Sequence, residues 1–182
     1  AMPALKGLTS MEKRNFLLVL HSCINIDGRV SLFELSVLWI LEKYLNPAEE
    51  LFRSVKIFSF SGIGLDVVVL LQALACTGHT ADKAKAQEAF HAGIARIPEL
   101  AAHKPVFTFE EIASYAKVNN ALTRLIEASF KIRESVIDAC AHCAFSDHEV
   151  TVEERELLRI IALALQCPLP PFVETSPEKD AA

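Results

Sequence analysis

The sequence has no excess of positive charge, because 23 aspartates and glutamates outnumber 18 lysines and arginines and give a net charge of −5. A nucleic-acid partner is therefore not expected, since no basic stripe is present to neutralise phosphates. The same balance argues against strong binding to anionic lipid. The longest apolar run, Phe60–Cys76, is too short and too often interrupted to span a bilayer. We therefore expect no direct membrane insertion by this chain.

Motifs for catalysis are also missing. The sequence contains no G-x-S-x-G, no glycine-rich phosphate loop and no Walker lysine. His148-Glu149 begins like the H-E-x-x-H motif of zinc proteases, but Val152 stands where the second histidine would be. The chain is therefore not expected to be an enzyme, and no catalytic or cofactor-binding residue is assigned.

The five cysteines are odd in number and mostly lie in apolar helical patterns. With no secretory signal at the start, we expect reduced thiols and a cytoplasmic location rather than a disulfide framework. Cys140-Ala-His-Cys143 has the spacing of a metal or redox motif, but no second ligand cluster and no βαβ pattern accompany it. Buried, unreactive thiols are the interpretation that we favour.

Apolar residues are abundant, at 52% of the chain, so a substantial core is expected. Apolar spacing of i, i+3/i+4 recurs and strand-like alternation is missing, which predicts an all-α fold of about seven or eight helices. Residues 1–9 are expected to be an expression scar and flexible lead-in. Residues 10–172 should form a single helical domain, and residues 173–182 a disordered tail.

Local signals place the helices. Leu65–Thr77 is apolar nearly all round and predicts a central buried helix that Gly78 ends. Thr80 is expected to cap a helix reaching Ile97, whose small residues would allow close packing, and Pro98 and Pro105 bracket a predicted loop. The other helices are expected over Ser10–Ile26, from Ser31 to Tyr44, from Thr108 to Ala128, over Phe130–Phe145, and from Thr151 to Cys167, with a start signal at Asn46-Pro47.

A helix–acidic turn–helix pattern occurs twice, in Cys23–Leu45 and Cys143–Leu165, and the two copies align without a gap. The identical pairs are Cys23/Cys143, Asp27/Asp147, Val30/Val150, Glu34/Glu154, Leu38/Leu158, Ile40/Ile160 and Leu45/Leu165. Ser31–Glu34, Thr108–Glu111 and Thr151–Glu154 also have the capping-box pattern, in which a hydroxyl and a carboxylate satisfy helix-start amides.

The two turns gather carboxylates at helix starts, and two interpretations stay open. Capping and helix-dipole chemistry account for the Ser31/Glu34 and Thr151/Glu154 pairs. Alternatively, the turns hold a divalent cation such as calcium, which takes six to eight oxygen ligands. The candidate ligands are Asp27, Glu34, Asp147, Glu149 and Glu154.

The doubled D-G-x-V-S/T-x-x-E turn, in which His148 replaces the glycine in the second copy, resembles the TerB-like helical domain. LQALACTGHTADKAKAQEAFHAGIARI, a proline-containing linker, the second turn and ALQCPLPPF together resemble the C-terminal cytosolic region of HtpX-like membrane zinc metallopeptidases. The resemblance covers about Asn15–Phe172. It implies a TerB-like bundle held at the cytoplasmic face of the inner membrane, with catalytic zinc only in a protease segment that this sequence does not include. It also implies metal binding through Asp27, Glu34, Asp147 and Glu154.

The leading hypothesis is a non-catalytic regulatory or interaction domain that contacts the protease segment of the same polypeptide or another protein. The alternative is a free-standing TerB-like stress domain that responds to a divalent cation through its acidic turns. A protein partner requires an exposed surface of apolar character, whereas a cation sensor requires converging oxygen ligands.

Overall fold

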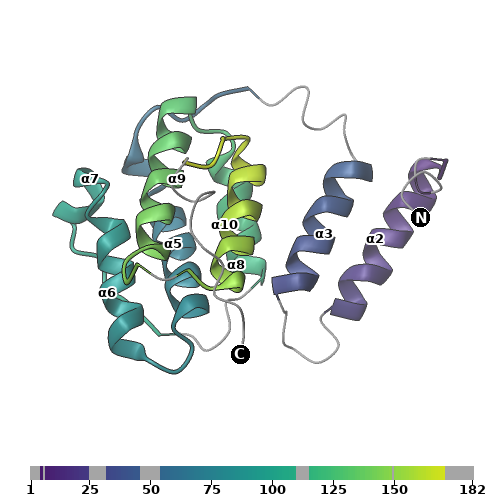
Figure 1. Cartoon of the computed structure of the whole chain (residues 1–182). Coiled ribbons are helices and arrows are strands. Elements are labelled where there is room, and N and C mark those ends of the chain that lie inside the picture. Colours follow the sequence, from purple (N-terminus) through teal and green to yellow (C-terminus); the bar gives the residue numbers. More distant parts are fainter. Residues whose placement is uncertain are drawn as a thin grey trace. The chain divides into compact units, whose positions relative to one another are not determined.

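The computed structural model is all-α, as the apolar spacing predicts, and describes residues 5, 7–24, 32–45, 54–109, 115–148 and 150–170. These residues form eight α-helices and one short 3-10 helix (Figure 1). The chain divides into two compact units, Ala1–Ser54 and Val55–Ala182. The prediction of a single domain over residues 10–172 stays a prediction, since two compact units can still unfold together. No helix within the described ranges is long and apolar enough to cross a bilayer.

The first unit contains helices α2 (Ser10–Ile24) and α3 (Leu32–Leu45), which pack against each other. A capping box that the sequence analysis did not identify starts α2. The Thr9 amide donates to Glu12 Oε2 at 2.8 Å, and the Glu12 amide donates to Thr9 Oγ1 at 3.3 Å. The hydrogen bonds from Thr9 lower the pKa of the Glu12 carboxyl. His21 Nε2 lies 2.8 Å from Glu42 Oε1 and links the two helices.

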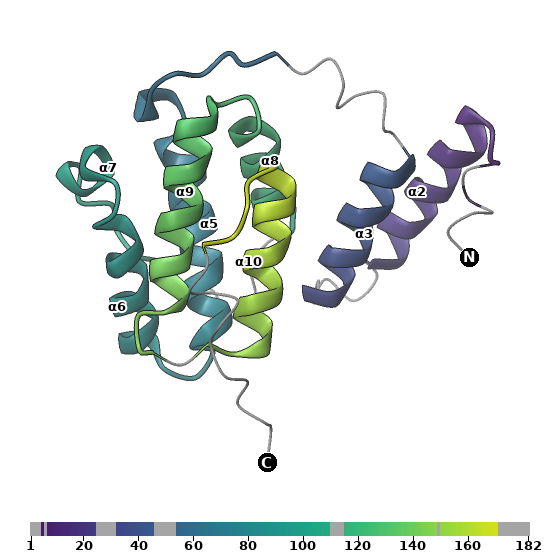
Figure 2. The ribbon, with the colours of Figure 1, turned by 45° about the horizontal axis from the view of Figure 1, so that its top comes forward.

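Helix α5 (Gly64–Gly78) is the centre of the second unit, which confirms the predicted buried helix. It packs against α6 (Lys83–Ile94), α8 (Tyr115–Leu125), α9 (Phe130–Ala144) and α10 (Val152–Leu165) (Figures 1 and 2). The buried residues of α5 are Asp66, Val67, Leu70, Leu71, Ala73, Leu74, Ala75 and Cys76. A helix surrounded by other helices needs apolar residues on most of its circumference, which is the pattern that its sequence shows.

The contact between α6 and α9 depends on a small residue, as the sequence predicts. A Cβ atom at Gly93 would lie 3.0 Å from the Ala139 carbonyl oxygen, 3.0 Å from Cys143 Cβ and 2.8 Å from Leu71 Cδ2. Backbone atoms of α9 cannot move aside as a flexible side chain can. The absent side chain therefore sets the distance at which these helices pack.

Two predictions about the segment from Thr80 to Pro105 need correction. Asp82, not Thr80, caps α6, because its Oδ1 accepts hydrogen bonds from the Ala84 amide at 3.0 Å and the Lys85 amide at 3.1 Å. A carboxylate two residues further along thus provides the acceptor closest to the free amides. The predicted loop is partly helical, since Pro98–Ala102 forms α7 with proline at its first position, where no amide hydrogen is needed.

The final helix confirms its predicted start and ends slightly earlier than expected. The capping box between Thr151 and Glu154 is present at the start of α10. At the other end, Gln166 has a φ of 52° and closes the helix in the left-handed conformation. Arg133 of α9 donates to the carbonyl of Leu165, the last residue of α10, which satisfies one acceptor at this helix end.

Several predictions lie outside the described residues or only partly within them. They are the capping box at Ser31–Glu34, the start signal at Asn46-Pro47, the second half of the box at Thr108–Glu111, and the tail at 173–182. These remain predictions from the sequence.

Candidate functional site

The structure locates part of the predicted acidic site. Asp147 and Glu154 lie in the described part of the second turn. Asp27 and Glu149 fall outside the described residues, and Glu34 lies in α3 with its side chain outside the description. The proposal that the first turn binds a cation therefore stays a prediction, and the second turn is the one whose geometry can be followed.

Glu154 is the most unusual residue of this turn, because its carboxyl is buried and only 1% of the residue is exposed. Glu154 Oε2 accepts hydrogen bonds from the Thr151 amide and from Thr151 Oγ1, each at 2.9 Å. The Glu154 amide donates in return to Thr151 Oγ1 at 3.1 Å. One carboxyl oxygen is thus fully used in capping α10.

The other oxygen, Glu154 Oε1, is buried without a hydrogen-bond partner among the described residues. It lies against the last residue of α5, where a Cβ atom on Gly78 would be only 1.8 Å away. No side chain at position 78 is compatible with this carboxyl position. Sequence reasoning gave Gly78 the role of ending α5, and the structure adds that Gly78 makes room for Glu154.

The environment of Glu154 weakens its acidity. Burial raises the pKa of the Glu154 carboxyl to about 7, the hydrogen bonds from Thr151 oppose this, and the charges of Asp147 and Glu153 add to the rise. Burial disfavours the ionised form because a charge loses its hydration. Near neutral pH this carboxyl can therefore hold a proton or, when ionised, offer Oε1 to a cation.

The thiols in the C-terminal parts of α5 and α9 are buried, which is the interpretation that the sequence favours. Cys76, Cys140 and Cys143 are buried free cysteines. Burial raises the pKa of Cys140 to about 12 and that of Cys143 well above its ordinary value. Cys143 Sγ donates to the Leu71 carbonyl at 3.6 Å. A thiol that stays protonated is a poor nucleophile and a poor metal ligand.

Within the described ranges, no group of three or more His, Cys, Asp or Glu side chains is placed to hold a metal ion. Asp147 and Glu154 alone supply fewer oxygens than calcium takes. A cation at this turn would need further ligands, and Glu149 is the remaining predicted candidate there.

Sequence reasoning assigned no role to an ion pair between the buried Asp66 of α5 and the exposed Arg124 of α8. Asp66 is 8% exposed, and Arg124 Nη1 of α8 lies 3.0 Å from its Oδ2. Burial raises the pKa of Asp66, and the Arg124 guanidinium opposes that rise. The available signal was a carboxylate inside an otherwise apolar run, which predicts a partner. Nothing in the sequence identified Arg124 as that partner.

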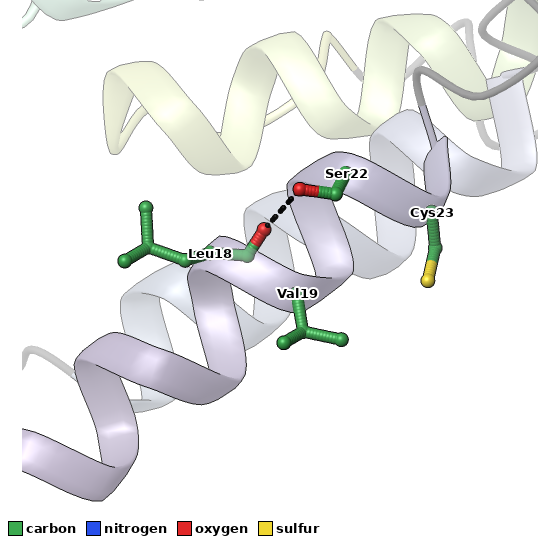
Figure 3. A pocket seen from close by; sticks show the side chains of 4 residues that line it. All are labelled: Leu18, Val19, Ser22 and Cys23. Atoms are coloured by element: carbon green, nitrogen blue, oxygen red, sulfur yellow. Dashed lines mark hydrogen bonds between the residues drawn. The ribbon is translucent and has the colours of Figure 1, made fainter.

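Helix α2 of the first unit carries an exposed apolar face. Met11 is 71% exposed, Leu18 57% and Val19 63%. Leu18, Val19, Ser22 and Cys23 line a shallow hollow of about 270 Å³, in which the side chains of Val19 and Cys23 point the same way (Figure 3). Ser22 Oγ donates to the Leu18 carbonyl at 3.0 Å, so the hydroxyl is satisfied within the helix. The face therefore presents carbon and sulfur to solvent.

Comparison with known proteins found no matching family model, no matching curated protein and no matching solved structure. The resemblance to TerB-like and HtpX-like proteins therefore rests on the sequence motifs alone.

Proposed function

We propose that this chain is a non-catalytic regulatory and interaction domain with a TerB-like fold and a pseudo-repeated acidic unit. In this proposal it is the cytosolic C-terminal part of a membrane zinc metallopeptidase at the cytoplasmic face of the inner membrane. Its partner is the protease segment of the same polypeptide or another protein. The zinc belongs to that protease segment. The all-α fold and the doubled turn motif support the proposal.

The observation that carries it is the exposed apolar face of α2. Met11, Leu18 and Val19 follow i, i+7, i+8 spacing, which puts them on one side of the helix. Leaving such side chains in water forgoes about 1.5–3 kcal/mol for each one that could be fully buried. Large apolar side chains that are exposed on one side of a helix are a feature of protein-interaction sites.

The position of Cys23 allows a direct test. Cys23 is exposed beside this face, whereas Cys76, Cys140 and Cys143 are buried. A thiol-reactive photo-crosslinker would therefore label Cys23 first in the folded protein. The purified, labelled domain is then added to the membrane fraction of the source organism and irradiated. It should crosslink to a protease segment. Leu18→Glu should abolish the crosslink, because a charge on the face cannot be buried against a partner.

Ala84→Glu is the matched control, because Ala84 is exposed on α6 and the substitution adds the same charge away from the face. It should leave the crosslink unchanged. An antibody against the domain gives an independent check on membrane and soluble fractions. A soluble band near 20.1 kDa, the mass of this chain, would contradict the membrane-protease proposal.

The buried Oε1 atom of Glu154, which has no hydrogen-bond partner in the described structure, favours a second function. We propose, as the alternative, a free-standing stress domain whose second acidic turn responds to a divalent cation. Glu154 Oε1 is buried without a hydrogen-bond partner in the described structure, and the charge of Asp147 acts on the same carboxyl. A cation between them would satisfy the oxygen and remove the repulsion.

Thermal unfolding with calcium, magnesium or zinc at millimolar concentration tests this alternative. A bound ion should raise the melting temperature, and the rise should be larger at pH 8 than at pH 6, because Glu154 is ionised at the higher pH. Asp147→Ala should abolish the rise, whereas Glu88→Gln, on the exposed side of α6, should not. An unchanged melting temperature at both pH values would exclude the cation response.

A further inference from the structure

A cavity of about 830 Å³ lies in the second unit, at the N-terminus of α5. Its walls come from the 3-10 helix η1 (Phe60–Gly62), from the first turns of α5 and α9, and from α7 and the end of α8. Figures 1 and 2 show α7 beside the ends of α5 and α9. The volume is within the range of about 300–1,000 Å³ that is usual for small-molecule sites.

The cavity has an apolar floor and an apolar rim. Ile97 and Ile132 are buried in its wall, with 1% and 6% of each residue exposed. Phe58 and Leu65 also line it, yet they are 75% and 81% exposed. A ligand with a hydrocarbon body would cover these two side chains, and removing their apolar surface from water would favour binding.

The polar groups of the cavity are predominantly cationic. Arg96, Arg124 and Lys131 line it, against a single lining carboxylate, Glu99. Two of the cations are engaged: Arg124 pairs with Asp66, and Arg96 Nε lies 2.8 Å from Asp138 Oδ2. Arg96 makes this bond through Nε, and neither of its Nη groups forms a hydrogen bond with a residue in the described part of the chain.

Lys131 differs from the two arginines. Its side chain makes no hydrogen bond or ion pair with any residue in the described part of the chain. It stands in the first turn of α9, whose N-cap residue Ser129 forms no side-chain cap. The start of α5, at Ile63, has no side-chain cap either. The first turns of both helices line the cavity, so the positive ends of their dipoles lie at its wall.

We propose that this cavity binds a small amphipathic anion, an aliphatic or aromatic monocarboxylate. Its carboxylate pairs with Lys131 and the Nη groups of Arg96, and its hydrocarbon body covers Leu65 and Phe58. A neutral alcohol of the same length gains only the apolar contacts. An alkylammonium ion of the same length is repelled. The lining residues of this site include none of the α2 face and none of the acidic turn, so the proposal goes beyond both functions proposed above.

Isothermal titration of the full chain with octanoate, octan-1-ol and octylammonium tests the proposal. Octanoate should bind at least about tenfold more tightly than octan-1-ol, and octylammonium more weakly than either. Lys131→Gln should reduce octanoate affinity about tenfold and leave octan-1-ol binding unchanged. Lys83→Gln, a matched removal of an exposed lysine on α6, should change neither. Leu65→Ser, at a side chain that the fold does not bury, should weaken octanoate and octan-1-ol alike.

Three results would overturn the proposal. Equal affinity for octanoate and octan-1-ol would identify a plain apolar docking surface. Octanoate binding that survives Lys131→Gln would place the ligand elsewhere. Binding to phosphatidylglycerol vesicles with no binding of free octanoate would identify a membrane surface as the occupant.

Discussion

At the scale of single residues, Glu154 and Gly78 are the pair on which the second acidic turn depends. One carboxyl oxygen caps α10 through Thr151, and the other is buried against the end of α5 without a hydrogen-bond partner in the described structure. The arrangement combines a stabilising cap with an unsatisfied acceptor, and the balance between them changes with the protonation state of Glu154.

The first prediction concerns the pH dependence of stability. Because burial raises the pKa of Glu154 in the folded state from the ordinary 4.5 to about 7, the folded protein binds a proton more tightly than the unfolded chain. The resulting stabilisation is fully present below pH 4.5 and is lost as the pH rises through about 7. Its size is on the order of 2–3 kcal/mol. Urea unfolding of the wild type and Glu154→Gln between pH 4.5 and 8 measures it.

The variant should be more stable than the wild type at pH 8, and the difference should shrink toward pH 4.5. Glutamine keeps the shape and one acceptor of the side chain but cannot ionise. Parallel stability curves for the two proteins would show that Glu154 titrates at its ordinary pKa.

The second prediction concerns Gly78. Gly78→Ala should lower the free energy of unfolding by about 1–3 kcal/mol, because the new Cβ atom overlaps Glu154 Oε1 and forces the carboxyl out of its position. Gly62→Ala is the control, since nothing lies within 4 Å of a Cβ atom there. Adding Glu154→Ala to Gly78→Ala should cost less than the sum of the single changes, and strict additivity would contradict the contact.

At the scale of helices, the starts of α2, α6 and α10 depend on which side chain reaches the free amides. Thr9 and Thr151 form capping boxes with Glu12 and Glu154. Asp82 caps α6 alone. Each of these three helix starts thus uses an oxygen that is held close to the first free amides, and the residue type by itself does not decide which candidate is used.

The third prediction tests the corrected cap of α6. Asp82→Ala should lower the free energy of unfolding by about 1 kcal/mol, because two amides lose their acceptor. Thr80→Ala, the change at the cap that the sequence suggested, should be nearly neutral, since Thr80 is exposed. Chemical denaturation of both variants at one pH gives the comparison. An equal decrease in the free energy of unfolding of the two variants would show that Thr80 also contributes to the start of α6.

At the scale of the whole molecule, the two compact units differ in how much they can bury. The second unit encloses α5 within four other helices, whereas the first contains the pair α2 and α3. Two packed helices share one interface, and short helices gain most of their stability from packing. The units should therefore differ in their ability to fold when separated.

The fourth prediction follows from this difference. Residues 55–182 expressed alone should give a helical circular dichroism spectrum and a cooperative urea transition. Residues 1–54 alone should give little helical signal, because a chain of that size with one helix–helix interface buries too little apolar surface. A folded first unit, or an unfolded second one, would contradict the assignment of the core to α5 and its neighbours.

The sequence predicted the all-α class, the central position of α5, the close packing at Gly93 and the capping box at Thr151. These features follow from local periodicity and from short-range hydrogen bonds, which the sequence contains directly. The contact of Gly78 with Glu154 and the pairing of Asp66 with Arg124 join residues far apart in the chain. Helix packing decides such pairs, and no local pattern records them. The family resemblance and the cation ligands remain predictions.

The central position of α5 also affects how the protein is made. Gly64–Gly78 leaves the ribosome well before α10, which begins at Val152 and covers part of it. At about 5–20 residues per second, α5 waits about 4–15 s for that neighbour. During this interval the part of its apolar surface that α10 covers in the folded protein is open to other nascent chains. A ribosome-associated chaperone that shields this one segment would protect the whole domain from aggregation.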